Sequence, residues 1–170
     1  VLALKDGRRV TRERQWWRQR RHEIVEDFER EVVGRVPATA PKVSWRVTQA
    51  QPMEIGGRAV IARRLVGRAD NRDFPAIDVN IEMVLVTPQD AKRAVPVMIL
   101  FGRAALPGDP PPQGAFVPPP PPPPPGSDPP ATEQLIRAGW GYAYLNPASI
   151  QADNGAGLTR GVIGLANRGQ

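Results

Sequence analysis

The 170-residue chain contains no cysteine and only one histidine, His22. Without cysteine it can form neither a disulfide nor a thiolate metal site. His22 lies among arginines, where a solvated surface side chain is a stronger interpretation than a metal ligand. Asp153 and Asn154 lack the further oxygen ligands at alternating positions that a calcium loop requires. We therefore expect no metal and no cofactor.

The chain also lacks any apolar run close to the roughly 20 residues of a membrane span. Its first ten residues lack the long apolar region of a signal peptide, so any export signal has been removed or never existed. Lysine is scarce, with three among 23 basic residues, yet the formal net charge is +6. Because the arginines are scattered along the chain, a solvated surface is a better interpretation than a nucleic-acid interface. We expect neither a membrane nor a nucleic-acid partner.

Three glycines, Gly155, Gly157 and Gly161, follow an apolar run and precede a predicted helix, as in a phosphate-binding loop. Their spacing does not match a dinucleotide fingerprint, and the chain has no Gly-Lys-Ser/Thr tripeptide. Positive φ angles and close backbone packing are the stronger interpretation of these glycines.

No serine lies in the Gly-x-Ser-x-Gly elbow that a serine hydrolase of the α/β type uses. The serines are Ser44, Ser127 and Ser149. Since His22 is a poor candidate for the base, residues 1–170 contain no complete catalytic set.

Residues 11–34 have the periodicity of an amphipathic helix, with Thr11 as a candidate cap and Gly34 at the end. Its predicted apolar face consists of Trp17, Ile24, Val25, Phe28 and Val32. Arginines dominate the first half and acidic residues the second, opposite to what the helix dipole favours. Packing must therefore stabilise this helix.

Alternating residues predict strands over 43–50, 58–67 and 76–88, with a turn at Gly56 and Gly57. In the third strand, one face is predicted to carry Ile77, Val79, Ile81, Met83 and Leu85. This is the pattern of a half-buried antiparallel strand.

An apolar run over 95–102 predicts a central strand that is covered on both faces. A helix over 131–139, ending at Gly139, and a strand over 140–145 complete a parallel strand–helix–strand unit. The sequence thus predicts a mixed α/β sheet, antiparallel strands first. The last strand would leave a bare apolar edge, so we expect the chain to be the front half of a larger domain.

Residues 103–130 form a proline-rich insertion in this parallel unit, with prolines throughout 118–125. A stiff loop is the stronger interpretation, and a ligand for a proline-recognition domain is the alternative.

Several segments together carry a family resemblance: "LKDGRRV", "RRHEIVEDFEREVVGRVP", "VPVMILFG", "GWGYA" and "SIQADNGAGLTRGVIGLANRGQ". In this order and spacing they resemble the N-terminal half of bacterial glucuronoyl esterases, carbohydrate esterase family fifteen. The insertion over 103–130 departs from the family pattern, and Val33 stands where an aromatic residue, typically Tyr, is expected.

The resemblance implies an α/β-hydrolase fold in which residues 1–170 are the N-terminal portion of a single catalytic domain. It implies a secreted or periplasmic serine esterase that cleaves lignin esters of 4-O-methyl-glucuronic acid on xylan. Its partners would be that glucuronoxylan–lignin substrate and the C-terminal half of the same domain. The Ser, His and acid of the triad would follow Gln170, so residues 1–170 alone should be inactive.

Three residues are candidates for the border of the site. Phe101 and Gly102 end the first parallel strand, where α/β-hydrolases place the loop that completes the oxyanion hole. Phe116, in the insertion, could offer an aromatic surface to lignin or sugar. The alternatives are a place in the core, which the sequence favours for Phe101, and a local cluster of Phe116 with Val117.

Two other functions remain open from the sequence. One is another carbohydrate esterase of the same fold, such as an acetyl-xylan esterase, because the fold does not fix the substrate. The other is a non-enzymatic interaction protein that displays the polyproline segment.

Overall fold

The computed structural model describes the whole chain except residues 1, 39, 112–123, 125 and 156. The chain divides into two compact units, Val1–Ala40 and Pro41–Gln170. Among the described residues, every helix is too short or too polar to cross a lipid bilayer.

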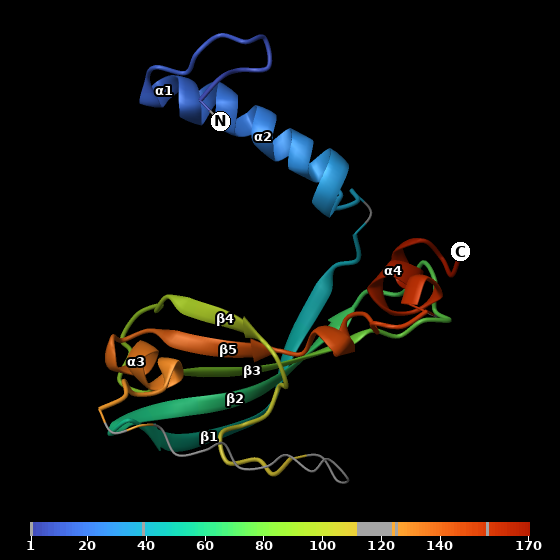
Figure 1. Cartoon of the computed structure of the whole chain (residues 1–170). Helices are drawn as coiled ribbons and strands as arrows, with labels where there is room; N and C mark the ends of the chain where they lie inside the picture. Colours follow the sequence, from blue (N-terminus) through green and yellow to red (C-terminus); the bar gives the residue numbers. More distant parts are fainter. Residues whose placement is uncertain (1, 39, 112–123, 125, 156) are drawn as a thin grey trace. The chain divides into compact units, whose positions relative to one another are not determined.

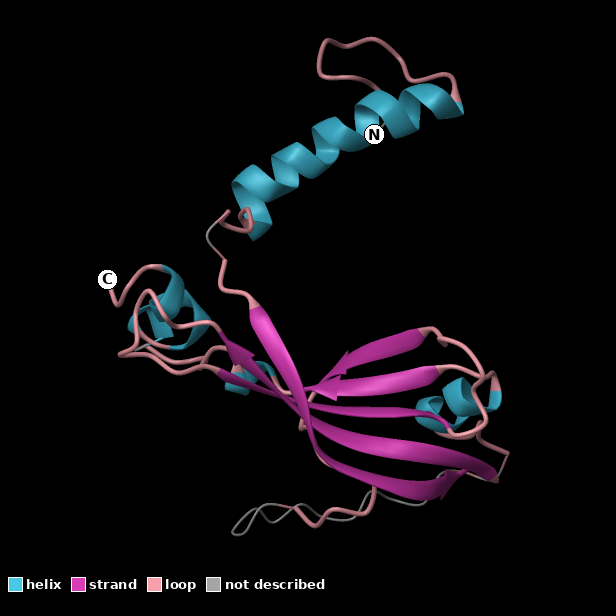
Figure 2. Cartoon of the chain, turned by 180° about the vertical axis from the view of Figure 1, so that it is seen from behind, coloured by secondary structure: helices cyan, strands magenta, loops and turns pink. Residues whose placement is uncertain are grey.

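The first unit contains a helical run that confirms the helix predicted over 11–34 (Figure 2). Its segments are α1 (Glu13–Gln15), η1 (Trp16–Arg20), α2 (Arg21–Phe28) and η2 (Glu29–Val33), with π-helical hydrogen bonding in η1 and η2. The run ends at Gly34, whose φ is +75°. The predicted cap is wrong: Arg12 precedes α1, and the Thr11 hydroxyl donates to Gln15 Oε1 at 3.4 Å.

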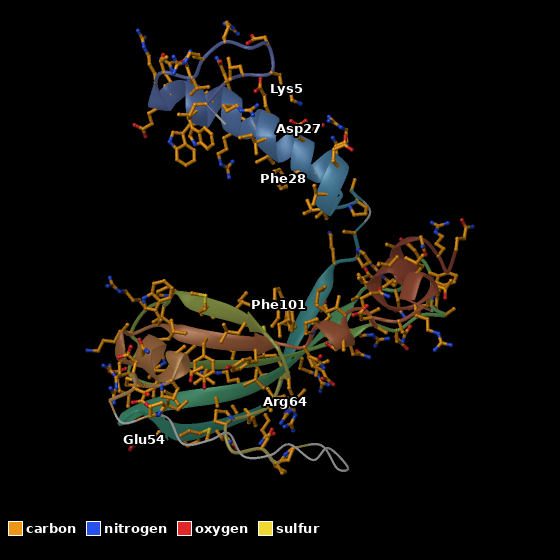
Figure 3. All side chains as sticks on the ribbon, viewed as in Figure 1. Lys5, Asp27, Phe28, Glu54, Arg64 and Phe101 are labelled. Carbon is orange, nitrogen blue, oxygen red and sulfur yellow. The ribbon has the colours of Figure 1, made fainter. Side chains whose placement is uncertain are left out.

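The segment before the helix folds back along it. Leu4 and Val10 are buried, and Lys5 Nζ pairs with Asp27 Oδ1 of α2 at 2.6 Å (Figure 3). The predicted apolar face is only partly covered, since Trp17 and Phe28 each expose more than half of their surface.

The second unit is built on a five-stranded sheet in the order β1-β2-β3-β5-β4 (Figure 1). The strands are β1 (Val43–Ile55), β2 (Arg58–Ala69), β3 (Asn80–Pro88), β4 (Val97–Phe101) and β5 (Gly141–Leu145). β1, β2, β3 and β5 pair antiparallel in turn, whereas β5 and β4 pair parallel. The predicted mixed sheet, with antiparallel strands first and a parallel unit after, is confirmed. Gly56 and Gly57 form the β1–β2 turn with φ of +56° and +75°.

The helix α3 (Ala131–Arg137) joins β4 to β5, and Gly139 follows it with φ of +78°. The prediction that residues 140–145 form the edge is wrong, because β5 lies between β3 and β4. Within the described chain β4 is the edge strand instead. The prediction of a central strand covered on both faces is also wrong here, since Met98 on one face is 43% exposed and Ile99 and Phe101 on the other are 56% and 76% exposed.

Two apolar clusters lie on opposite faces of the sheet. The first contains Val60, Ala62, Val84, Val86, Ala104, Leu106, Ile136 of α3 and Tyr142. The second contains Ala69, Val79, Ile81 and Leu165 of α4 (Gly161–Ala166). Because α3 and α4 lie at opposite ends of the sheet (Figures 1 and 2), β3 is buried on one face at each end. The predicted single buried face is therefore wrong: Val84 and Val86, on the other face, are fully buried.

Candidate functional site

The predicted site residues Phe101 and Gly102 lie at the carboxyl end of β4, beside the carboxyl end of β5. Phe101 pairs with Leu145, and the Gly102 N–H donates to the Leu145 carbonyl at 3.0 Å. Parallel α/β sheets bind ligands at this edge. The Phe101 side chain projects from the sheet and is 76% exposed (Figure 3), so a place for it in the core of the described chain is wrong.

Gly102 completes the ladder between β4 and β5. Its N–H is already bonded to Leu145, so this group is not available to stabilise an oxyanion. A Cβ added at Gly102 would make only an ordinary contact with the Tyr144 ring, at 3.5 Å. The Gly102 N–H therefore belongs to the sheet, and the loop that follows β4 begins after it.

That loop is anchored to the sheet by Arg64 of β2, a residue that the sequence reading missed. Arg64 Nη2 pairs with Asp109 Oδ2 at 2.6 Å, and Arg64 Nη1 donates to the Ala104 carbonyl at 3.2 Å (Figure 3). Asp109 Oδ2 also accepts from the Leu106 N–H at 2.8 Å. This N–H, followed by Arg64, holds the pKa of Asp109 below its ordinary value. The only sequence signal was the pair Arg63–Arg64 inside the largely apolar stretch "RAVIARRLVG".

A second set of polar contacts fixes the chain after β5. Ser149 Oγ accepts from the Glu82 N–H at 2.9 Å and donates to the Asn146 carbonyl at 2.6 Å. Asn146 Nδ2 donates to Glu82 Oε2 at 2.9 Å. Ser149 precedes the glycine segment, and its two hydrogen bonds join its hydroxyl to the backbone of Glu82 and Asn146. Its hydroxyl therefore has a structural role here.

The glycine segment is organised by Gln151. Gln151 Oε1 accepts from the Ile163 N–H at 3.0 Å, and Gln151 Nε2 donates to the Gly157 carbonyl. The Val162 N–H donates to the Ile150 carbonyl at 3.0 Å. Because the N–H groups of Val162 and Ile163 are bonded within the protein, they are not available to a phosphate.

The predicted positive φ is correct at Gly161, with +61°, and wrong at Gly155 and Gly157. A Cβ at Gly161 would lie 2.6 Å from Gln151 Oε1 and 2.7 Å from the Ile150 carbonyl oxygen. At Gly157 it would lie 2.9 Å from the Ala152 carbonyl oxygen, whereas at Gly155 it would meet nothing within 4 Å. Close backbone packing thus explains Gly157 and Gly161.

Tyr142 is a buried titratable side chain of the sheet. Burial raises the pKa of Tyr142 to about 12, so this phenol stays neutral near pH 7. Within the described ranges, no group of three or more His, Asp or Glu side chains could hold a metal ion. Phe116 and most of the proline run lie outside the described residues.

The comparisons with known proteins identify the relatives of this arrangement. The chain matches no protein-family model. Its structure resembles that of a CE15 glucuronoyl esterase from Teredinibacter turnerae T7901 with a TM-score of 0.70 and 25% identity, over 99% of this chain. The chain is related to the CE15 glucuronoyl esterases.

Two further relatives agree with this. A glucuronoyl esterase from Solibacter usitatus matches 95% of the chain with a TM-score of 0.64 and 25% identity. The carbohydrate esterase MZ0003, from an unknown prokaryotic organism, is 30% identical over 98 residues, which are 58% of this chain and 22% of that protein. The chain spans 40% of the Teredinibacter structure and 43% of the Solibacter structure, less than half of either. The sheet and its N-terminal helix therefore match part of a CE15 α/β-hydrolase structure.

Proposed function

We propose that the chain forms part of a glucuronoyl esterase, which hydrolyses lignin–carbohydrate esters of 4-O-methyl-glucuronic acid on xylan. The observation that carries this proposal is the likeness to a CE15 glucuronoyl esterase over 99% of the chain. Because the polymer lies outside the cell, the proposal places the protein in the periplasm or the extracellular medium.

The proposal assigns the serine, histidine and acid of the triad to the C-terminal half of the same catalytic domain. It is supported by the chain's coverage of only 40% of the Teredinibacter structure. The apolar edge strand β4 also supports it, since Ile99 and Phe101 are exposed and bare apolar edges are uncommon in folded domains. We propose that the C-terminal half pairs with β4 and covers Ile99, whereas Phe101, at the carboxyl end of the strand, faces the substrate.

In this proposal the described residues position the substrate and do not attack it. Arg64 and Asp109 hold the loop after β4, so that backbone N–H groups beyond Gly102 can face the carbonyl oxygen of the ester. Phe101 and Phe116 would offer aromatic surface to the alcohol or to a sugar ring.

Hydrolysis of a benzyl ester of glucuronic acid tests the proposal. The polypeptide encoded by the intact gene and residues 1–170 alone are assayed side by side, with acetylated xylan as the competing substrate. We expect the intact polypeptide to release benzyl alcohol and residues 1–170 to be inactive. Faster hydrolysis of acetylated xylan would favour an acetyl-xylan esterase. A reading frame that stops after Gln170 would contradict the proposal and favour an interaction protein.

A variant tests the aromatic surface. Phe116→Ala in the intact polypeptide should raise KM for the benzyl ester more than for the methyl ester. Equal kinetics for the variant and the parent would refute this role.

A further inference from the structure

A surface cavity of about 550 Å³ lies at the start of the helix in the first unit. It is lined by Thr11, Arg12, Arg14, Gln15, Arg18 and Gln19. All six side chains can donate hydrogen bonds, and three carry a fixed positive charge. No acidic side chain is among them. A lining of this composition favours an anionic ligand.

The three arginines of the cavity form no ion pair with any residue that the structure describes. Five other basic residues of this unit pair with acids: Lys5 with Asp27, Arg8 with Asp6, Arg20 with Glu23, Arg30 with Glu31, and Arg35 with Glu26. Arg9 and Arg21 also form no ion pair with a described residue, but only Arg12, Arg14 and Arg18 lie together around one cavity. The neighbouring Glu13 carboxylate accepts from Trp17 Nε1 at 3.3 Å instead.

Helix stability does not account for these arginines. Positive charges near the N-terminal end of a helix interact unfavourably with its dipole. Arg14 and Arg18 are four residues apart, so their like charges also repel each other. A bound anion would compensate both effects.

An exposed aromatic side chain lies in the same turns. Trp17 is 55% exposed, and the Arg21 guanidinium lies over its ring at 5.8 Å from the centroid. Exposed indole rings stack on the apolar faces of pyranose rings. Trp17 does not line the cavity, but it lies three positions after Arg14, so these two side chains are neighbours on the helix surface. A ring that suits sugars therefore lies beside one of the three arginines that suit carboxylates.

We propose that this arginine surface, Arg12, Arg14 and Arg18 with Trp17, binds an acidic polysaccharide through its free uronate carboxylates. Guanidinium groups match carboxylates with paired, charge-assisted hydrogen bonds. The choice of glucuronoxylan as the polymer rests on the proposed function, because that polymer carries both uronates and pyranose rings. The surface would hold the protein on its polymer.

Titration of the complete chain with glucuronoxylan, followed by tryptophan fluorescence, tests the inference. The matched ligand is the same polymer with its carboxyl groups reduced to alcohols. Arg14→Gln/Arg18→Gln should weaken binding of native glucuronoxylan about tenfold, since exposed charge pairs contribute modestly. Arg30→Gln/Arg35→Gln removes the same charge from the same helical unit, and it should change binding less than about twofold. Arg14→Lys/Arg18→Lys keeps the charge and should retain more binding than the glutamine variant.

Three results would overturn the inference. The first is equal binding of native and carboxyl-reduced polymer, and the second is equal weakening by the two glutamine variants. The third is tighter binding of single-stranded RNA than of glucuronoxylan at the same ionic strength, which would indicate a nucleic-acid interface. Ester hydrolysis without polymer binding would refute this inference alone, whereas uronate-dependent binding without hydrolysis would refute the proposed function alone.

Discussion

Gly161→Ala should destabilise the segment that links β5 to α4. Gly161 has a φ of +61°, and its missing side chain leaves room for Gln151 and the Ile150 carbonyl. An alanine Cβ would lie 2.6 Å from Gln151 Oε1 and 2.7 Å from the Ile150 oxygen. Because the second of these atoms is backbone, it cannot rotate away.

The magnitude follows from two effects. The left-handed conformation costs an L-residue about 1–2 kcal/mol, and a buried overlap costs about 1–3 kcal/mol. We expect a total of about 2–5 kcal/mol, which corresponds to roughly 30- to 5,000-fold faster local opening.

Hydrogen exchange of the Ile163 N–H measures this directly, because that group donates to Gln151 Oε1 at 3.0 Å. Gly155→Ala is the matched control, since its Cβ would meet nothing within 4 Å and its φ is not positive. Its effect should stay within about 0.5 kcal/mol. If Gly161→Ala accelerates exchange no more than Gly155→Ala does, then Gln151 does not organise the segment.

Three further perturbations test other parts of the structure. Ile136→Ala, at a fully buried position, should lower the free energy of unfolding measured in urea by about 2–5 kcal/mol. Leu158→Ala is the control, since Leu158 is 68% exposed, and an equally large effect there would contradict the described core. Arg72 hydrogen bonds lower the pKa of Asp70 from 3.8 to about 2, so their stabilisation is present above pH 3.8 and is lost as pH falls through about 2. Arg72→Gln should raise that pKa toward 3.8 in an NMR titration, and an unchanged pKa would refute the contact. Arg64→Met should speed amide exchange in residues 103–109, and unchanged exchange would show that Arg64 does not anchor the loop.

The local elements could be predicted from the sequence because each depends on a short pattern. Alternation marked β1, β2 and β3, and the pair Gly56–Gly57 marked the turn between the first two strands. The helix end at Gly34 and the helix stop at Gly139 both follow from positive φ, which glycine adopts readily.

The order of strands could not be predicted in the same way. β4 and β5 are both short and apolar, so their composition does not say which one pairs with β3. That choice depends on the register between Val84 and Tyr144, residues distant in the sequence. The exposure of Phe101 could not be predicted either, because an apolar strand is buried only where another element covers the face of the sheet.

The end of β4 at Phe101 was predicted from the sequence and is confirmed, whereas the role of Phe101 and Gly102 in a site stays a prediction. The sequence did not indicate Arg64 and Asp109, which anchor the loop after β4, or Gln151, which organises the glycine segment. The Arg64–Asp109 pair joins residues 45 positions apart, and Gln151 bonds to the Gly157 carbonyl six positions away. Such contacts leave no periodic signal in a single sequence.

Covalent labelling with a fluorophosphonate tests the central proposal most directly, because this reagent reacts with the activated serine of serine esterases. The polypeptide encoded by the intact gene is labelled, digested and mapped by mass spectrometry. We expect one phosphonylated serine outside residues 1–170, with loss of benzyl glucuronate hydrolysis in proportion to labelling. A label on Ser149, or hydrolysis that continues after complete labelling, would contradict the assignment of this chain to the part of a serine esterase that lacks the nucleophile.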